Sequence, residues 1–368
     1  MKTLLLLSAL LIFVHNSSLA QTQTDIPYGS DPLQKLDYWS AASPAAPIII
    51  IAHGGGWFTG DKSGAPYQNA SQLFNNEGYA VVNINYRLTP TVTYPSHIED
   101  ITCALAWTKN NASLMNGDSS RIVIYGHSAG GQIAAYLGVR PINSMLAGCS
   151  NTAGLNVDGV ILTSATVDFD MTNPADWSPI INMLGDTSLY WDVAQPTNHC
   201  ANNFSTKFLI LCGDLDNLWI DQDSAFHDSL IYYNHCSRLH MFTGYDHSTM
   251  ITNLTATNAV FLAMTSFLDS LWNNQLCIPT GMEEPLISSF TVYPNPSSGY
   301  FTVNIPLIRQ AKAELKIVDL LGKEVSFQTI KDNYRETFCV NLNLPCGIYF
   351  LQLKSDDFIQ NIKLEVIK

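Results

Sequence analysis

The sequence is poor in charge, and poorest in positive charge. Charged residues make up 13% of the 368 residues, and 18 Lys and Arg stand against 31 Asp and Glu, which gives a formal net charge of −13. Nucleic acids and anionic membrane surfaces are bound through clusters of basic side chains. The charge balance therefore argues against partners of both kinds. Because 46% of the residues are hydrophobic, general disorder is excluded as well.

The eight cysteines lack the spacing of a metal site. The sequence contains no CxxC pair and no Cys/His cluster with the spacing of zinc ligands, so we expect no structural zinc. No cofactor is expected, and a structural cation at the acidic residues 214–223 stays open, although their spacing is not that of an EF-hand. Cys103 and Cys212 lie in apolar runs and are interpreted as buried small side chains. Cys339 and Cys346 are close enough in sequence to form a disulfide. The pairing of the remaining cysteines stays open.

A long apolar run occurs only at the N-terminus, and it is too short to span a membrane. Residues 4–14 are almost entirely apolar, Lys2 precedes them, and small residues at 18–20 match the site that a signal peptidase cleaves. A membrane-spanning helix needs about 20 apolar residues. We therefore predict a signal peptide over residues 1–20, a mature chain that begins at Gln21, and no membrane span after cleavage.

Between residues 47 and 272, short apolar runs alternate with helical patterns. The runs that predict strands are residues 48–52, 80–85, 121–125, 159–163, 208–212 and 238–242. The patterns that predict helices are residues 96–110, 129–139 and 253–273. Continuous apolar strands are typical of strands that are buried on both faces. The alternation predicts an α/β fold with a mostly parallel sheet and helices on both faces.

Two stretches interrupt this alternation and divide the chain. Residues 168–204 are rich in Pro, Asn, Asp and aromatic residues, and we interpret them as an insertion or lid over the active site, with an ordinary surface excursion as the alternative. After an α/β domain over residues 21–276, residues 277–289 have the composition of a linker. Residues 290–368 show short alternating strands and turns, which predict a small all-β sandwich.

The strongest local pattern is GHSAG at residues 126–130. It directly follows the predicted strand 121–125 and directly precedes the predicted helix 129–139. This context is that of a nucleophile elbow, in which small flanking residues allow a sharp strand-to-helix turn that exposes the serine. We therefore predict that Ser128 is a catalytic nucleophile.

A second pattern is HGGGW at residues 53–57, which follows another predicted strand. Acyl transfer needs N–H donors aimed at a developing oxyanion, and a glycine-rich loop lets the backbone approach the substrate. We assign these donors to the amides of Gly55, Gly56 and Ala129. His53 is interpreted as a residue that orders the loop and not as an acid or base.

A serine nucleophile needs a base, and the base needs an acid that holds its tautomer. GDLD at residues 213–216 and GYDH at residues 244–247 each follow a predicted strand, in the chain order Ser, Asp, His that this kind of fold requires. We predict His247 as the base. Asp216 is preferred over Asp214 as the acid, because Asp214 immediately follows the strand and can brace the turn.

Together these motifs resemble the α/β-hydrolase esterases of the hormone-sensitive-lipase and bacterial feruloyl/acetyl-esterase type. The matching segments are HGGGWFTGDK, NYRLTP, YPSHIEDITCALAWTKNN, IYGHSAGGQIA, CGDLDNL and GYDHS. The resemblance implies the α/β-hydrolase fold, a triad and an oxyanion hole on the residues already named: Ser128, Asp216 and His247, with Gly55, Gly56 and Ala129.

The resemblance also assigns framework positions and shows one departure. Arg87 and Asp100 match structural positions of the family. Around Asp216, the family usually carries His-Gly before the acid segment and Val-Pro after it, whereas this chain has Cys212 and the pair Leu-Trp at residues 218–219. The assignment of the acid therefore depends most on its position after the strand.

The C-terminal part resembles the sorting domain of the type IX secretion system. The segments that carry this likeness are FTVYPNPSSGYFTVNI, LKIVDLLGKEV, LPCGIYFLQLK and the final Lys368. The resemblance implies export through the type IX machinery of a Gram-negative bacterium, with the protein secreted or held at the cell surface. A carbohydrate-binding β-sandwich is the competing interpretation.

These expectations combine into a secreted serine carboxylesterase that acts through an acyl-enzyme. The secretory route suggests ester substrates linked to polysaccharides, such as acetyl or feruloyl esters. The alternatives are a peptidase or amidase that uses the same triad, or a non-catalytic surface binding protein of the same fold. Acyl and alcohol specificity, oligomeric state and the tail cleavage site stay open.

Overall fold

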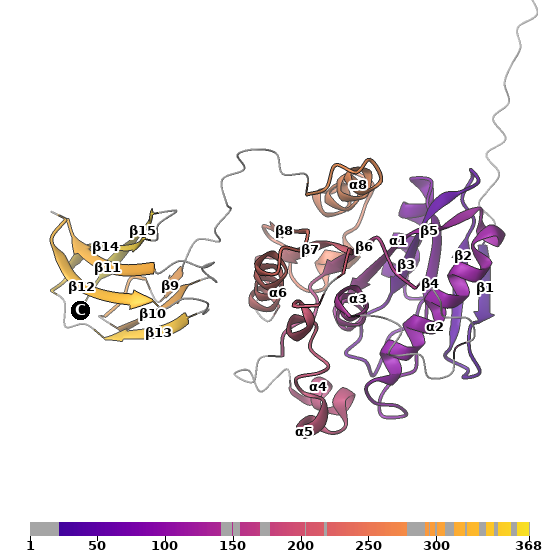
Figure 1. The fold of residues 1–368 in the computed structure, drawn as a ribbon, viewed down its shortest axis with the longest axis horizontal. Coiled ribbons are helices and arrows are strands. Elements are labelled where there is room, and N and C mark those ends of the chain that lie inside the picture. Colours follow the sequence, from indigo (N-terminus) through magenta and orange to yellow (C-terminus); the bar gives the residue numbers. More distant parts are fainter. Residues whose placement is uncertain are drawn as a thin grey trace, which may run out of the picture.

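The structure, a computed structural model, describes two parts of the chain (Figure 1). The residues described are 22–140, 149, 155–169, 177–202, 204–216, 219–277, 291–293, 295–298, 300–305, 313–320, 322–330, 336–341, 345–354 and 359–367. The predicted signal peptide over residues 1–20 lies outside the described residues, as does the predicted linker from residue 278 onward.

The first part contains an eight-stranded sheet in the order β1-β2-β4-β3-β5-β6-β7-β8. Its strands are β1 (Thr22–Pro27), β2 (Lys35–Trp39), β3 (Ala46–Ala52), β4 (Ala80–Ile84), β5 (Gly117–His127), β6 (Gly159–Thr163), β7 (Lys207–Gly213) and β8 (Ser237–Phe242). The pairs β1·β2 and β2·β4 are antiparallel, and every pair from β4·β3 to β7·β8 is parallel. The predicted α/β class with a mostly parallel sheet is confirmed.

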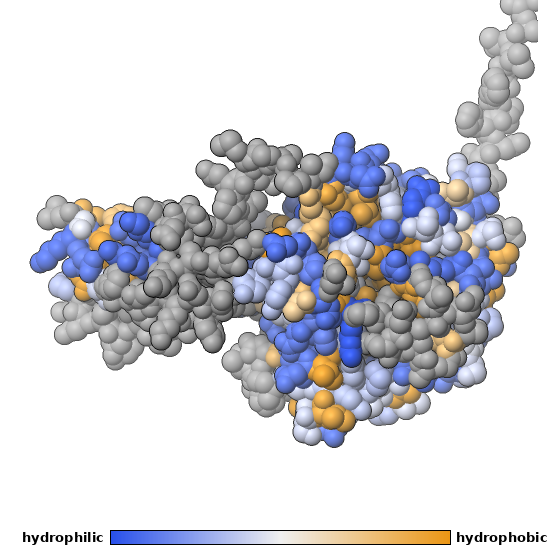
Figure 2. All heavy atoms as spheres, in the orientation of Figure 1, coloured by the Kyte–Doolittle hydropathy of each residue, from blue (hydrophilic) through white to orange (hydrophobic). Residues whose placement is uncertain are grey.

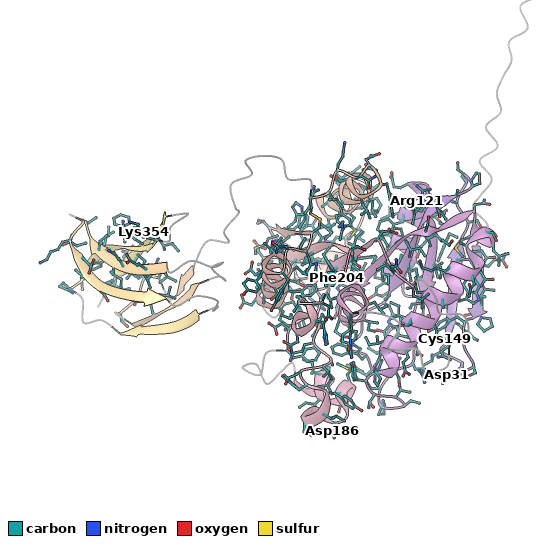
Figure 3. All side chains as sticks on the ribbon, viewed as in Figure 1. Asp31, Arg121, Cys149, Asp186, Phe204 and Lys354 are labelled. Carbon is teal, nitrogen blue, oxygen red and sulfur yellow. A yellow bond between two sulfur atoms is a disulfide. The ribbon has the colours of Figure 1, made fainter. Side chains whose placement is uncertain are left out.

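Helices cover both faces of the sheet because side chains alternate along each strand. Ile48 and Ile50 of β3 belong to one buried cluster, whereas Ile49 and Ile51 belong to the other. The helices that pack into the first cluster are α2 (Ser96–Asn111), α3 (Ala129–Val139) and α6 (Ile220–Tyr232). The helices that pack into the second are α1 (Ala65–Asn76) and α8 (Ala259–Trp272). Figure 3 shows the side chains that fill the space between these layers.

The predicted strands and helices of this part are all present, with small shifts at their ends. One prediction was too long: residues 253–258 precede α8, whose first turn is capped by the Asn258 side chain as it accepts a hydrogen bond from the amide of Phe261. The short helix α7 (Thr249–Thr252) lies just before them. β1, β2 and α1 were not predicted from the sequence, because polar residues break the apolar period there.

The described part of the predicted insertion is helical and packs against the loop before α2 and against α3. It contains α4 (Trp177–Leu184), α5 (Thr187–Tyr190) and the 3₁₀ turn η4 (Pro196–His199). The amide of Tyr94 donates to the carbonyl of Met183 at 2.7 Å, and Gln132 Nε2 on α3 donates to the carbonyl of Ala194 at 2.9 Å. Its function as a lid stays a prediction.

In its described ranges, the second part contains two antiparallel sheets in the orders β13-β10-β9 and β12-β11-β14-β15. Their strands are β9 (Thr291–Tyr293), β10 (Tyr300–Ile305), β11 (Ala313–Asp319), β12 (Glu324–Ile330), β13 (Glu336–Asn341), β14 (Gly347–Lys354) and β15 (Ile359–Val366). Side chains from both sheets are buried, among them Val303 and Leu351. The prediction of a small all-β module is therefore confirmed.

The described residues contain two disulfides, Cys103–Cys149 and Cys236–Cys277. The interpretation of Cys103 as a buried small side chain was wrong, because the side chain is only partly buried and forms a disulfide with Cys149. An apolar run in the sequence does not reveal which side of a helix a residue occupies. Cys212 is buried and free, in agreement with the prediction. Cys346 is exposed and free, so the bridge proposed for it is not formed.

The surface of the molecule is mixed in character. On the face shown in Figure 2, apolar side chains are scattered among hydrophilic ones. Within the described ranges, no helix is long and apolar enough to cross a membrane. Across the same residues, no group of three or more His, Cys, Asp or Glu side chains is placed to hold a metal ion.

Candidate active site

Ser128 lies in the sharp turn between β5 and α3. Its backbone has φ 55° and ψ −122°, a conformation that L-residues rarely adopt. The turn requires close backbone contacts: a Cβ on Gly126 would lie 2.3 Å from the carbonyl oxygen of Gly130, and a Cβ on Gly130 would lie 2.3 Å from that of Ala52. The two flanking glycines are therefore needed for this turn, and α3 begins immediately after the serine.

The His247 side chain lies between Ser128 and Asp216. Its Nε2 is 2.9 Å from Ser128 Oγ, and its Nδ1 is 3.1 Å from Asp216 Oδ2. The Asp216 side chain is 3% exposed and that of His247 is 32% exposed, so the acid is buried and the base is open to solvent. Because a carboxylate only accepts, Nδ1 carries the proton and Nε2 is free to accept the hydroxyl proton of Ser128.

Asp214 has a different partner. Its Oδ1 accepts a hydrogen bond from the amide of Gly244 at 2.7 Å, and so the side chain braces the loop that follows β8. The structure thus brings Asp216, and not Asp214, to the imidazole.

The loop after β3 approaches Ser128 through its glycines. Gly55 has φ 120° and Gly56 has φ 58°, backbone conformations that glycine adopts readily. Gly54 donates its amide to the hydroxyl of Tyr67 at 2.7 Å and is therefore engaged. Among the described residues, no acceptor takes the amides of Gly55, Gly56 or Ala129. These three N–H groups are thus available to an oxygen atom of a ligand.

His53 is buried and orders the loop, as predicted. Its Nδ1 donates to the carbonyl of Gly54 at 2.7 Å, and its ring stacks on Tyr86 with 4.3 Å between the centroids. Burial lowers the pKa of His53 to about 4, so the side chain is neutral at pH 7. It lies behind the site as a structural residue.

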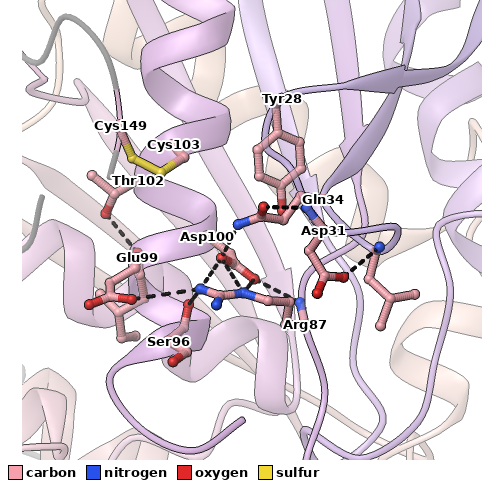
Figure 4. A network of polar contacts seen from close by, with 12 residues as sticks. Tyr28, Asp31, Gln34, Arg87, Ser96, Glu99, Asp100, Thr102, Cys103 and Cys149 are labelled. Atoms are coloured by element: carbon pink, nitrogen blue, oxygen red, sulfur yellow. Dashed lines mark hydrogen bonds and ion pairs between the residues drawn. A yellow bond between two sulfur atoms is a disulfide. The ribbon is translucent and has the colours of Figure 1, made fainter. Parts of the chain in front are cut away.

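Arg87 and Asp100 form an ion pair in which the carboxylate is buried and the guanidinium is partly exposed (Figure 4). The guanidinium donates through Nε at 2.9 Å and Nη2 at 2.6 Å to Asp100 Oδ1, and Gln34 Nε2 donates to the same oxygen at 2.7 Å. These groups line a polar cavity of about 400 Å³ that also includes Tyr28 and Glu99. The saturated hydrogen bonding of Asp100 agrees with a framework function.

Sequence reasoning missed several side chains that border the site. The Trp219 ring lies 5.5 Å from the His247 ring, and Phe58 is 54% exposed beside Gly56. His127 was read only as part of the elbow motif, although its ring lies 4.9 Å from that of His247. For Phe58, the feature of the sequence that could have indicated a place beside the site is an aromatic residue within a glycine-rich loop.

Asp223 on α6 is a buried carboxyl group near the acid. Its side chain is fully buried, and neither of its oxygens has a side-chain partner among the described residues. Burial raises the pKa of Asp223 well above its usual range, and the nearby Asp216 carboxylate raises it further. Both effects favour the protonated, neutral form of the group. The position of Asp223 at the start of a helical run suggests only a charge in the first turn of a helix.

The parallel sheet, the turn at Ser128 and the imidazole beside it define the α/β-hydrolase class. The chain belongs to the BD-FAE family, whose model matches residues 37–230, slightly more than half of the chain. A second model, that of the secretion system C-terminal sorting domain, matches residues 291–368. The tail is thus a sorting domain of the kind that the resemblance implied.

Similar proteins agree with this class. Esterase LipC of Mycobacterium tuberculosis is 36% identical over 115 residues, which are 30% of this chain and 28% of that protein. The probable carboxylic ester hydrolase LipM of the same organism is 30% identical over 222 residues, 56% of this chain and 51% of that protein. The chain therefore spans between about a quarter and a half of the length of these relatives.

Solved structures share the fold. A truncated carbohydrate esterase from gut microbiota has a TM-score of 0.60 at 22% identity and covers 70% of this chain and 98% of its own. Esterase B of Lactobacillus rhamnosis has a TM-score of 0.61 at 21% identity, with 70% and 88% covered. At these identities the likeness concerns the fold.

Proposed function

We propose that this chain is a secreted serine carboxylesterase in which Ser128, His247 and Asp216 form the catalytic triad. The observation that carries the proposal is the imidazole of His247, whose two nitrogens lie within 3.1 Å of the serine hydroxyl and of a buried carboxylate. The buried carboxylate stabilises the imidazolium that forms when His247 takes the proton.

The reaction proceeds in two halves through an acyl-enzyme. Ser128 Oγ attacks the ester carbonyl as its proton passes to His247 Nε2, and the tetrahedral intermediate expels the alcohol, which takes that proton. Water then attacks the acyl-enzyme with His247 again as the base. The carboxylic acid leaves and Ser128 Oγ regains its proton. No group outside this chain and its substrates is needed to balance these steps.

The oxyanion of each intermediate is stabilised by the amides of Gly55, Gly56 and Ala129. These donors point from rigid backbone, so they do not have to reorganise as charge develops on the oxygen. The first turn of α3 adds the positive end of its dipole at the same place. Loss of one such donor is expected to raise the barrier by about 3–4 kcal/mol.

The substrates that we propose are acetyl or feruloyl esters carried on polysaccharides. A secreted hydrolase meets polymers outside the cell, and the rim of this site offers apolar surface at Phe58, Trp219 and Leu215, of which Phe58 and Leu215 are more than half exposed. Planar aromatic groups stack on such side chains, whereas a bare acetyl group needs little of this surface. The described helices of residues 177–199 lie near the same rim, since a Cβ on Gly56 would lie 3.5 Å from Pro179 Cβ.

The sorting domain over residues 291–368 directs the enzyme to the type IX secretion machinery, which releases it or holds it at the surface of a Gram-negative cell. A chain that lacks these residues is expected to accumulate in the periplasm with its esterase activity intact. Fractionation of cells that express the two forms decides between this assignment and a carbohydrate-binding tail, which would leave export unchanged and weaken adhesion to polysaccharide.

The test of the catalytic proposal is hydrolysis of p-nitrophenyl esters from acetate to decanoate by the mature full chain and by Ser128→Ala. Activity on short chains that disappears in the variant supports the esterase and its nucleophile. Activity on peptide p-nitroanilides alone would show that the protein is an amidase and not an esterase. No activity on either substrate class would favour a non-catalytic binding protein.

A further inference from the structure

A chain of hydrogen bonds runs behind the proposed triad and joins three loops of the site. It begins at the amide of Gly54, which donates to the Tyr67 hydroxyl at 2.7 Å. The Tyr67 hydroxyl lies 3.4 Å from His127 Nδ1, and His127 Nε2 lies 2.9 Å from the carbonyl oxygen of His247. The loop after β3, the elbow and the loop after β8 are thereby connected through two side chains.

Each proton in this chain can be placed from the chemistry of the groups. The carbonyl of His247 can only accept, so His127 Nε2 carries the ring proton. His127 Nδ1 is then bare and can only accept, so the Tyr67 hydroxyl donates to it while its own oxygen accepts from Gly54. One tautomer of one histidine therefore satisfies every group in the chain.

The environment holds His127 in that neutral form. The side chain is 6% exposed, and burial, with the His247 ring beside it, lowers the pKa of His127 to about 4. Close packing holds the neighbouring loop against it, because a Cβ on Gly54 would lie 2.9 Å from His127 Nδ1 and 3.1 Å from Ser128 Cβ. Neither His127 nor Tyr67 touches the reacting atoms.

We propose that Tyr67 and His127 are positioning residues that set the catalytic geometry of this enzyme. His127 fixes the backbone that carries the His247 imidazole, and Tyr67 fixes the glycine loop that carries the amides of Gly55 and Gly56. The two ends of this chain of hydrogen bonds thus align the base and the oxyanion donors on the same serine. The inference rests on the proposed function and adds two residues to it.

A set of four variants tests this inference. Tyr67→Phe removes the bridging hydroxyl and keeps the ring, and His127→Leu removes both ring contacts. His127→Gln is the conservative variant, because its side-chain amide can still donate to the carbonyl of His247. Tyr28→Phe is the matched control, because it also removes one tyrosine hydroxyl that donates a hydrogen bond, here to the carbonyl of Asn85 at 2.6 Å, but lies outside the chain of bonds.

Two readouts separate positioning from stability and from the proposed function. The first is kcat and KM on p-nitrophenyl acetate; the second is the rate at which a fluorophosphonate labels Ser128, which needs the nucleophile, base and oxyanion donors but no ester. We expect Tyr67→Phe to lower kcat and the labelling rate about 10-fold and His127→Leu about 100-fold, with KM within about 2-fold of the wild type. His127→Gln should recover most of the loss, and Tyr28→Phe should stay within about 2-fold.

The inference is overturned if folded Tyr67→Phe labels Ser128 as fast as the wild type, or if His127→Gln is no better than His127→Leu. If His127→Leu does not fold, as judged by its thermal unfolding, Tyr67→Phe alone decides. A wild type that is labelled rapidly but hydrolyses no ester would refute the proposed esterase. In that case the labelling rates of the variants still decide on the positioning residues.

Discussion

Replacing Asp216 by Asn removes a charge without changing the shape of the side chain, and its cost can be worked out from the geometry. Asp216 Oδ2 lies 3.1 Å from His247 Nδ1, which places the centres of the two charges about 4 Å apart once the imidazolium forms. With an effective dielectric constant of about 20, this attraction amounts to about 4 kcal/mol, or about 10³-fold in rate at 1.36 kcal/mol per factor of ten. Asn can also hold His247 in the wrong tautomer, which increases the loss.

The assay is kcat on p-nitrophenyl acetate for the wild type, Asp216→Asn and Asp214→Asn. Asp214→Asn is the matched control, because an amide oxygen still accepts from Gly244 and the carboxylate it replaces does not touch the imidazole. We expect a loss of about 10³-fold or more for Asp216→Asn and less than about 3-fold for Asp214→Asn. If Asp216→Asn retained a tenth of wild-type activity, or if Asp214→Asn lost as much, the assignment of the acid and the electrostatic reasoning would both fail.

Three further predictions concern stability. Gly130→Ala places a Cβ 2.3 Å from the carbonyl oxygen of Ala52, and we expect the free energy of unfolding in urea to fall by about 3 kcal/mol or more. Arg87→Lys replaces a two-point contact with Asp100 by a single ammonium and should cost about 1–3 kcal/mol, measured in the same way; a change below about 0.5 kcal/mol would contradict the framework assignment. Asp223→Asn should flatten the pH dependence of stability. Because the folded pKa of Asp223 is raised, the contribution of this group to the free energy of unfolding is complete below about pH 4 and is lost as pH rises toward the folded pKa. In urea titrations, the free energy of unfolding of the variant should therefore increase relative to that of the wild type as pH rises from about 4 to about 8.

The sequence was informative wherever a motif fixes local backbone geometry. GHSAG between an apolar strand and a helix predicts the turn at Ser128, because few residues other than glycine avoid the contacts that this turn imposes. The order of Asp216 and His247 after later strands also follows from the sequence. In contrast, the sequence left Asp214 as an alternative to Asp216, because both residues follow the same strand. Only the three-dimensional structure shows which of the two carboxylates contacts the imidazole.

Contacts between distant segments could not be predicted. Tyr67 and His127 are 60 residues apart, and nothing in either local pattern indicates that their side chains meet. Cys103 shows the same limit, since its disulfide depends on where Cys149 passes beside α2. The raised pKa of Asp223 likewise depends on complete burial, whereas its sequence position suggests only a charge at a helix start.

The strand order of the sheet places the strand before His247 far from the strand before Ser128, and the chain of hydrogen bonds behind the site holds the two loops together. β8 lies three strands away from β5, and at about 4.8 Å per strand this is about 14 Å, yet His247 Nε2 lies 2.9 Å from Ser128 Oγ. The loop after β8 must therefore cross back over the ends of β7 and β6. It passes directly over Gly213, where a Cβ would lie 2.0 Å from the carbonyl oxygen of Tyr245. At the far end of this crossing, the bond from His127 Nε2 to the carbonyl of His247 ties the loop to the strand of the nucleophile. A base that is carried so far from its own strand needs such an anchor, and this is the physical reason to expect that His127 affects kcat and not only stability.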